Sequence, residues 1–266
     1  MTETERLTAE IREELGCTTV PVDLLSIIEQ ERIVMAPGDY GTNFNGRIEY
    51  LPSEKIFILY YPDDSSGVSK VRIRFTIAHE LGHYYLVEHR QLLLAGAVSD
   101  CAMGFTSENE REHEADEFAS CLLVPPKYLE QAMGSKRFMD LSAVVRMADD
   151  LQVSVPAAVI RYVHYAEEKC GVVLSQSGKV KYYVSSEEMG NIGFKTMPRE
   201  KSVPSSSKAR QLLLSQTPRQ CEGKLSSTSE WFYDRSTNLD LWEDSFSLGY
   251  SDQVITLLSI RRKADR

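Results

Sequence analysis

The sequence predicts an α+β fold built from more than one domain, and three observations support this. Helix-like apolar spacing alternates with short β-rich runs over roughly the first 170 residues. After Gly171 the pattern changes to short strands separated by turn residues. The chain has 266 residues, of which 42% are hydrophobic and 26% charged, the balance of a globular protein with a sizeable core. We expect three parts: residues 1–136, a helical segment at 137–169, and a smaller C-terminal α/β domain at 170–266.

Apolar periodicity and turn residues place the individual elements. Pro52-Ser53-Glu54 separates two β-rich runs and predicts an antiparallel hairpin, while Pro125-Pro126 should end the helix before it. Ser154 is a good N-cap for a following helix. The expected elements are helices at about 3–15 and from Leu24; strands at 32–36, 46–51 and 55–61; helices at about 69–88, 107–123, 140–151 and 155–169; strands at 172–174 and 180–183; and a helix near 207–214.

Composition excludes several classes of protein. The net charge of -9 argues against general affinity for nucleic acid or anionic membrane. The five cysteines form no C-x-x-C pair, which makes a disulfide framework or a cysteine zinc knuckle unexpected. The polar N-terminus lacks a signal-peptide pattern, and no apolar run approaches the roughly 18 residues of a membrane span. We therefore expect a cytoplasmic protein with no membrane partner.

The segment His79-Glu80-Leu81-Gly82-His83 carries the first chemical signal. Two histidines four residues apart lie on one face of a helix, so both imidazoles can reach one ion. Glu80 is rotated away from that pair and can act as general base on a water without being a ligand. Gly82 costs roughly 1 kcal/mol in a helix interior, which close approach of another segment would explain, although simple tolerance is an equal alternative.

A third ligand is expected from the acidic helix downstream. Glu112 and Asp116 lie four apart on one face, so Glu112 can complete a His2Glu site while Asp116 accepts the second N–H of a ligand histidine. Glu108 and Glu114 are the alternative ligands; Glu112 is preferred because an Asp follows it by one turn. This set suits Zn²⁺, although Mn²⁺ or iron could occupy it.

Both motifs resemble the ImmA/IrrE metallopeptidases. The resemblance is carried by the runs Arg74-Phe75-Thr76-Ile77-Ala78-His79-Glu80-Leu81-Gly82-His83 and Glu112-His113-Glu114-Ala115-Asp116-Glu117-Phe118-Ala119, and it covers roughly residues 15–170. Val20-Pro21-Val22-Asp23 and Val153-Ser154-Val155-Pro156 also fit the family. Val124 stands where a Met is common, and Asp116 where an Asn is frequent; neither removes a ligand.

The resemblance implies a compact zincin-like metallopeptidase domain followed by a helix-turn-helix-like element. His79, His83 and Glu112 would be the metal ligands and Glu80 the catalytic base. The implied substrate is a helix-turn-helix transcriptional repressor, cut to derepress stress-response, phage or mobile-element genes. Longer members carry a GAF-like sensor where this chain has residues 170–266.

Two other functions compete with peptide hydrolysis. One is a DNA-binding regulator acting through the helices at 140–169, but residues 137–169 carry four basic and five acidic side chains, a net charge of -1. Direct DNA binding is therefore not expected. The other is a sensor whose metal site is not catalytic; Glu80 argues against it because a structural site needs no acid there.

Further residues have less specific interpretations. Tyr84, Tyr85, His113 and Arg72 are candidates for an oxyanion donor, although each is more often structural. The strand at 55–61 could bind an extended substrate by edge pairing. We expect His89 and His164 to be surface or capped histidines and not ligands, and Cys101 to be a buried, inert thiol in preference to a thiolate that gates the zinc. Trp231 and Trp242 are expected in the core of the C-terminal domain.

Overall fold

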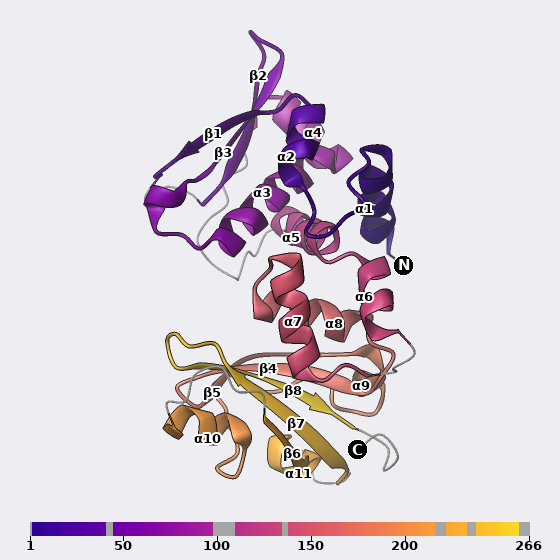
Figure 1. The fold of residues 1–266 in the computed structure, drawn as a ribbon, viewed down its shortest axis with the longest axis vertical. Coiled ribbons are helices and arrows are strands. Elements are labelled where there is room, and N and C mark those ends of the chain that lie inside the picture. The colour runs from indigo at the N-terminus through magenta and orange to yellow at the C-terminus, as the bar shows by residue number, and fades with distance from the viewer. Residues whose placement is uncertain are drawn as a thin grey trace. The chain divides into compact units, whose positions relative to one another are not determined.

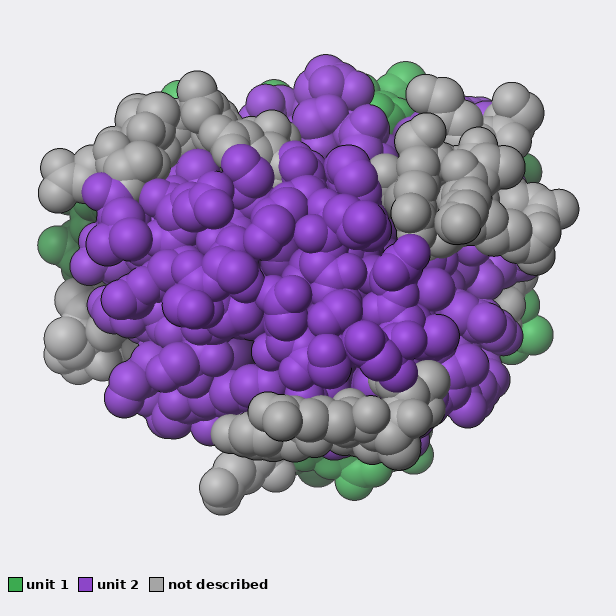
Figure 2. All heavy atoms as spheres, turned by 90° about the horizontal axis from the view of Figure 1, so that it is seen from below, with its two compact units in different colours: residues 1–128, 150–154 green, residues 129–149, 155–266 purple. Residues whose placement is uncertain are grey.

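The computed structural model describes residues 2–40, 45–97, 110–134, 138–215, 222–232 and 238–260 (Figure 1). These residues form helices and two β-sheets, which confirms the α+β class. The chain divides into two compact units, residues 1–128 with 150–154 and residues 129–149 with 155–266 (Figure 2). The division at 136 and 169 expected from the sequence stays a prediction.

The first unit combines a small sheet with the helices that carry both motifs. Its elements are α1 (Glu3–Glu14), α2 (Leu24–Gln30), β1 (Val34–Gly38), β2 (Arg47–Leu51), β3 (Ile56–Pro62), the 3-10 turn η1 (Asp64–Ser66), α3 (Lys70–Tyr85), α4 (Val87–Leu94) and α5 (Glu110–Leu123). Thr2 begins α1 with a capping box, in which its hydroxyl accepts from the Glu5 N–H while the Glu5 carboxylate accepts from the Thr2 N–H.

The three-stranded sheet has the order β1-β3-β2. β2 pairs antiparallel with β3 through the expected hairpin, and β1 pairs parallel with β3 on its other side. β3 is therefore the central strand, and both of its edges are occupied. The expectation that the strand at 55–61 binds a substrate by edge pairing is wrong for this reason, since a central strand has no free backbone edge.

The helix expected at 69–88 is two helices. α3 ends at Tyr85 because Leu86 takes an extended conformation, with φ −68° and ψ 120°, and α4 starts at Val87. α3 packs against both α5 and β3, and α1 packs on α5. α5 ends at Leu123, just before Pro125-Pro126 as expected. Pro126 then opens the next helix, in the first turn, where its missing N–H costs nothing.

The second unit contains a five-stranded antiparallel sheet of order β5-β4-β8-β7-β6. Its α8 packs on β4 and β5, while α10 packs on β7, β8 and β6. α6 and α7 extend from this unit into residues assigned to the first. The elements are α6 (Pro126–Met133), α7 (Leu141–Leu151), α8 (Val155–Tyr165), β4 (Cys170–Gln176), β5 (Lys179–Ser185), α9 (Glu187–Asn191), α10 (Lys208–Ser215), β6 (Glu222–Ser227), α11 (Thr228–Trp231), β7 (Asp240–Ser247) and β8 (Gln253–Ser259).

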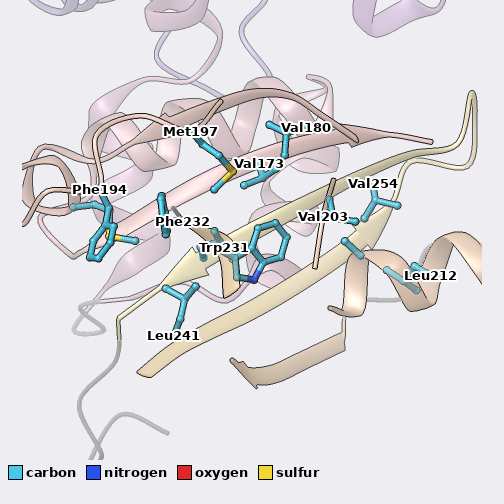
Figure 3. Close-up of a cluster of buried hydrophobic side chains, with 13 residues drawn as sticks. Val173, Val180, Phe194, Met197, Val203, Leu212, Trp231, Phe232, Leu241 and Val254 are labelled. Atoms are coloured by element: carbon cyan, nitrogen blue, oxygen red, sulfur yellow. The ribbon is translucent and has the colours of Figure 1, made fainter. Parts of the chain in front are cut away.

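One face of this sheet carries an apolar cluster that includes Trp231, Phe232, Val173 and Val254 (Figure 3). The Trp231 indole N–H donates to the buried carboxylate of Glu243 at 2.7 Å, which satisfies the polar edge of the ring. Trp231 thus confirms the expected core position. Trp242 does not join the cluster: it is half-buried, and its indole donates to Asp244.

Candidate metal centre

The two motif histidines face the same point from one side of α3. The Nε2 atoms of His79 and His83 lie 3.2 Å apart, and their side chains are 2% and 6% exposed. Both rings point away from water because β3, α4 and α5 surround this helix. The four-residue spacing therefore produces the convergent pair of imidazoles that the sequence predicted.

Glu112 is brought to the same point from α5. Its Oε2 lies 3.2 Å from His79 Nε2, and its Oε1 lies 3.4 Å from His83 Nε2. One ligand atom from each of the three residues falls within 4.8 Å of the others, a group that could hold a metal ion. Two imidazoles and one carboxylate form a donor set that zinc favours at catalytic sites, so the residues present fit such a group.

Asp116, one turn after Glu112, contacts the far side of the His79 ring. Its Oδ1 lies 2.8 Å from His79 Nδ1. If Nδ1 carries the proton and donates to Asp116, the Nε2 lone pair points toward the His83 and Glu112 ligand atoms. This geometry is the one expected of a residue that fixes a ligand histidine. Of the alternative ligands, Glu108 lies outside the described residues, and Glu114 contacts His89 instead.

Glu80 is fully buried between its neighbours on α3 and the start of β2. Gly46 lies directly over it: a Cβ added there would stand 2.8 Å from Glu80 Oε1 and 2.4 Å from Thr76 Cγ2. Only glycine permits the strand to approach this close. Gly46 could not be identified from the sequence, because a glycine at the start of a strand carries no signal of which helix it will face.

Gly82 plays the corresponding part on the opposite side of α3. A Cβ at this position would meet Ala115 Cα at 3.1 Å, the Ala115 carbonyl oxygen at 3.2 Å and Phe118 Cβ at 3.3 Å. The glycine therefore lets α5 pack against the backbone of α3. Of the two explanations for Gly82, the close approach of another segment is confirmed, and that segment is α5. This approach brings Glu112 of α5 within reach of the histidines.

His89 is a hydrogen-bonded histidine outside the candidate ligand set, which is one of the two roles expected for it. It is 3% exposed rather than superficial, its Nδ1 lies 3.1 Å from His83 Nδ1, and its Nε2 lies 2.8 Å from Glu114 Oε2. On an unbroken helix it would sit about 240° around the axis from His83. The break at Leu86 turns α4 back toward the site, and the helix expected at 69–88 contained no sign of this break. His164 is exposed, as expected.

Two of the oxyanion candidates in α3, Tyr84 and Tyr85, have other partners. The hydroxyls of Tyr84 and Tyr85 donate to the Glu31 carboxylate at 2.7 and 2.9 Å, which ties the end of α3 to the end of α2. The Arg90 guanidinium lies over the Tyr84 ring, 4.2 Å from its centroid. Burial and the Glu31 contact raise the pKa of Tyr84 to about 12. Both tyrosines are therefore structural, and His113 is exposed on α5.

The charge states of the candidate ligands suit a cation. Burial lowers the pKa of His83 below its ordinary value, an effect that the Glu112 contact only partly opposes. Burial alone would raise the pKa of Glu112, but its contacts with His79 and His83 reverse this and hold it well below its usual range. A neutral imidazole and an ionised carboxylate are the forms that bind metal.

Comparison with known proteins identifies this part of the chain. Residues 53–162 match the family model of the IrrE N-terminal-like domain, a peptidase family. This stretch belongs to the ImmA/IrrE family. The resemblance seen in the sequence is thus confirmed, and membership of this metal-dependent peptidase family implies protease activity for the IrrE-like domain.

No protein in the curated set gives a significant match. Among solved structures, a Mycobacterium tuberculosis transcriptional regulator is similar, with a TM-score of 0.61 at 13% sequence identity over 97% of this chain and 75% of that chain. At this identity the likeness concerns the fold alone. Among the helices of the described residues, none combines the length and the apolar character needed to cross a membrane. Cys101 falls outside the described ranges.

Proposed function

We propose that the IrrE-like domain is a zinc-dependent endopeptidase in which His79, His83 and Glu112 hold the ion. The observation that carries the proposal is the convergence of three ligand atoms within 4.8 Å on two helices, beside a buried carboxylate that is not one of them. A purely structural site gains nothing from that additional buried acid, because burying an acid is costly. Mn²⁺ is the alternative occupant.

The roles of the chain's own residues follow from their positions. A divalent cation in this site supplies Lewis acidity, which lowers the pKa of water toward about 7 and polarises a carbonyl. Glu80, on the turn between the two ligand histidines, accepts the proton of the attacking water and delivers it to the leaving amine. Asp116 holds the His79 ring in the tautomer that leaves Nε2 free to bind.

As substrate we propose a helix-turn-helix transcriptional repressor, cleaved in the cytoplasm to derepress stress-response or mobile-element genes. Family membership supports this, since a peptidase acts on protein. A direct role in DNA binding is less favoured. Arg161 is buried on α8, so the exposed charged residues of α7 and α8 are Arg146, Asp149 and Asp150, which together carry a net negative charge.

We propose further that the second unit is the sensory part, with a GAF-like fold. Two features support this: its five-stranded antiparallel sheet has a separate apolar core, and the unit contributes none of the predicted site residues.

The test is cleavage of the repressor encoded beside this gene, followed by mass spectrometry of the intact protein and its fragments. We expect one new pair of fragments, which a chelator abolishes and added Zn²⁺ restores. Glu80→Gln should bind zinc but produce no fragments, whereas Glu117→Gln, a matched change at an exposed acid of α5, should cut normally. Cleavage that persists in zinc-loaded Glu80→Gln would refute the proposed mechanism.

A further inference from the structure

A chain of three side chains leads from the candidate metal centre to the surface of α5. It starts at His83, passes through His89 on α4 and ends at Glu114 on α5. His89 is 3% exposed, and the Glu114 side chain is 50% exposed. The chain therefore joins a buried ligand to a solvated carboxylate, using residues from three different helices.

The role of His83 Nε2 determines where the ring protons of His83 and His89 lie. If His83 Nε2 is to bind a cation, its lone pair must be free, so the ring proton is on Nδ1. His83 Nδ1–H then donates to His89 Nδ1, 3.1 Å away, and that nitrogen must be an acceptor. The remaining proton of His89 is consequently on Nε2, where it donates to Glu114 Oε2 at 2.8 Å. With a cation on His83 Nε2, every ring nitrogen of the two histidines has a hydrogen-bond or ligand role.

We propose that His89 and Glu114 are positioning residues that set the tautomer and ring orientation of His83, an inference that rests on the proposed metal-dependent function. The site then has two such supports of different length. Asp116 accepts directly from His79, whereas Glu114 acts on His83 through one intervening imidazole. Three acids of one helix thus serve the site: Glu112 as ligand, and Glu114 and Asp116 as the two terminal acceptors.

Simple packing does not account for this arrangement. An apolar side chain would fill the space of His89 without bringing two more polar nitrogens out of water, which is costly unless both are hydrogen-bonded. Replacing His89 with Phe keeps a ring of similar size but leaves His83 Nδ1–H without its acceptor. His89→Asn, whose amide oxygen lies near the place of Nδ1, restores that one acceptor.

The experiment combines two readouts on the full chain, neither of which needs peptide cleavage. Competition against a chelator gives the Zn²⁺ dissociation constant, and nitrogen NMR of the histidine rings in metal-free protein gives the tautomers. We expect His89→Phe and Glu114→Leu to weaken zinc binding by about 10- to 100-fold. His89→Asn should recover part of this loss, and the exposed-acid control Glu117→Gln should bind as wild type. In His89→Phe the His83 ring should lose its Nδ1–H tautomer.

Unchanged zinc affinity together with an unchanged His83 tautomer in His89→Phe would overturn the proposal. If that variant fails to fold, as judged by circular dichroism, Glu114→Leu decides alone, because its half-exposed side chain can be replaced without opening the core. Failure of the peptidase proposal would appear separately, as normal zinc binding and tautomers in a wild-type protein that cuts nothing.

Discussion

Substitution of Gly82 by alanine tests whether the contact between α3 and α5 builds the candidate metal centre. The added Cβ would stand 3.1–3.3 Å from the Ala115 backbone and Phe118 Cβ. These atoms cannot rotate away as the end of a flexible side chain would. Since carbon atoms prefer about 3.5–4.0 Å, α5 would have to retreat by about 0.4 Å.

Two energies oppose each other in this variant. Alanine favours the helix by about 1 kcal/mol over glycine. Overpacking a core contact costs about 1–3 kcal/mol. We therefore expect a net loss of about 1 kcal/mol in the free energy of unfolding. Zinc affinity should fall more clearly, by about tenfold or more, because a shift of about 0.4 Å exceeds the roughly 0.2 Å tolerance of ligand distances.

Urea unfolding of the metal-free protein and chelator competition for Zn²⁺ measure the two effects. Gly190→Ala is the matched control: this glycine is also helical, and its added Cβ would meet neighbours only at 3.7 Å. It should be neutral or stabilising and leave zinc binding unchanged. If Gly82→Ala behaves like Gly190→Ala in both assays, the close approach of the helices is not what positions Glu112.

Three further outcomes are expected. Gly46→Ala should lower the free energy of unfolding by about 1–3 kcal/mol. Adding Thr76→Ala to this variant should restore part of the loss, because it removes the 2.4 Å clash between the new Cβ and Thr76 Cγ2. Additive effects of the two substitutions in a double-mutant cycle would contradict this. Asp116→Ala should weaken zinc binding by about 10- to 100-fold, and Asp116→Asn by less because an amide oxygen still accepts; equal losses would count against the hydrogen bond to the ring. The pKa of Tyr84 is raised from 10.0 to about 12, so the folded state favours the neutral phenol. The contribution of this phenol to the free energy of unfolding is complete below pH 10 and should decline by up to about 1.4 kcal/mol per pH unit as pH rises toward 12. Glu31→Gln should reduce this decline in alkaline unfolding experiments.

The sequence predicted which residues of the candidate site come together wherever helical periodicity decides it. His79, His83 and the pair Glu112 and Asp116 follow from four-residue spacing within single helices, which the chain's local geometry determines. His89 could not be found in this way, because its place depends on a single extended residue, Leu86, that redirects the chain.

Sheet order shows the same limit. The hairpin of β2 and β3 is local and was predicted, but the parallel pairing of β1 with β3 is a contact between strands that are not adjacent in sequence. Because the sequence pattern gives no strand order, β3 was mistaken for an edge. Gly46 was missed for a related reason: its requirement for glycine comes from a distant helix.

The hydrogen bonds of Glu31 help to hold α3, the helix that carries the two candidate ligand histidines. One carboxylate at the end of α2 secures two consecutive tyrosines, one of them lying under the Arg90 guanidinium, so the last turn of α3 is immobilised next to His83. Folding therefore already supplies much of the loss of conformational entropy needed to align the two imidazoles, so that less of it would remain for the binding of a cation. The end of α2 thereby preorganises the candidate site although it supplies none of the candidate ligands. Substitutions in α2 should therefore change metal affinity from a distance.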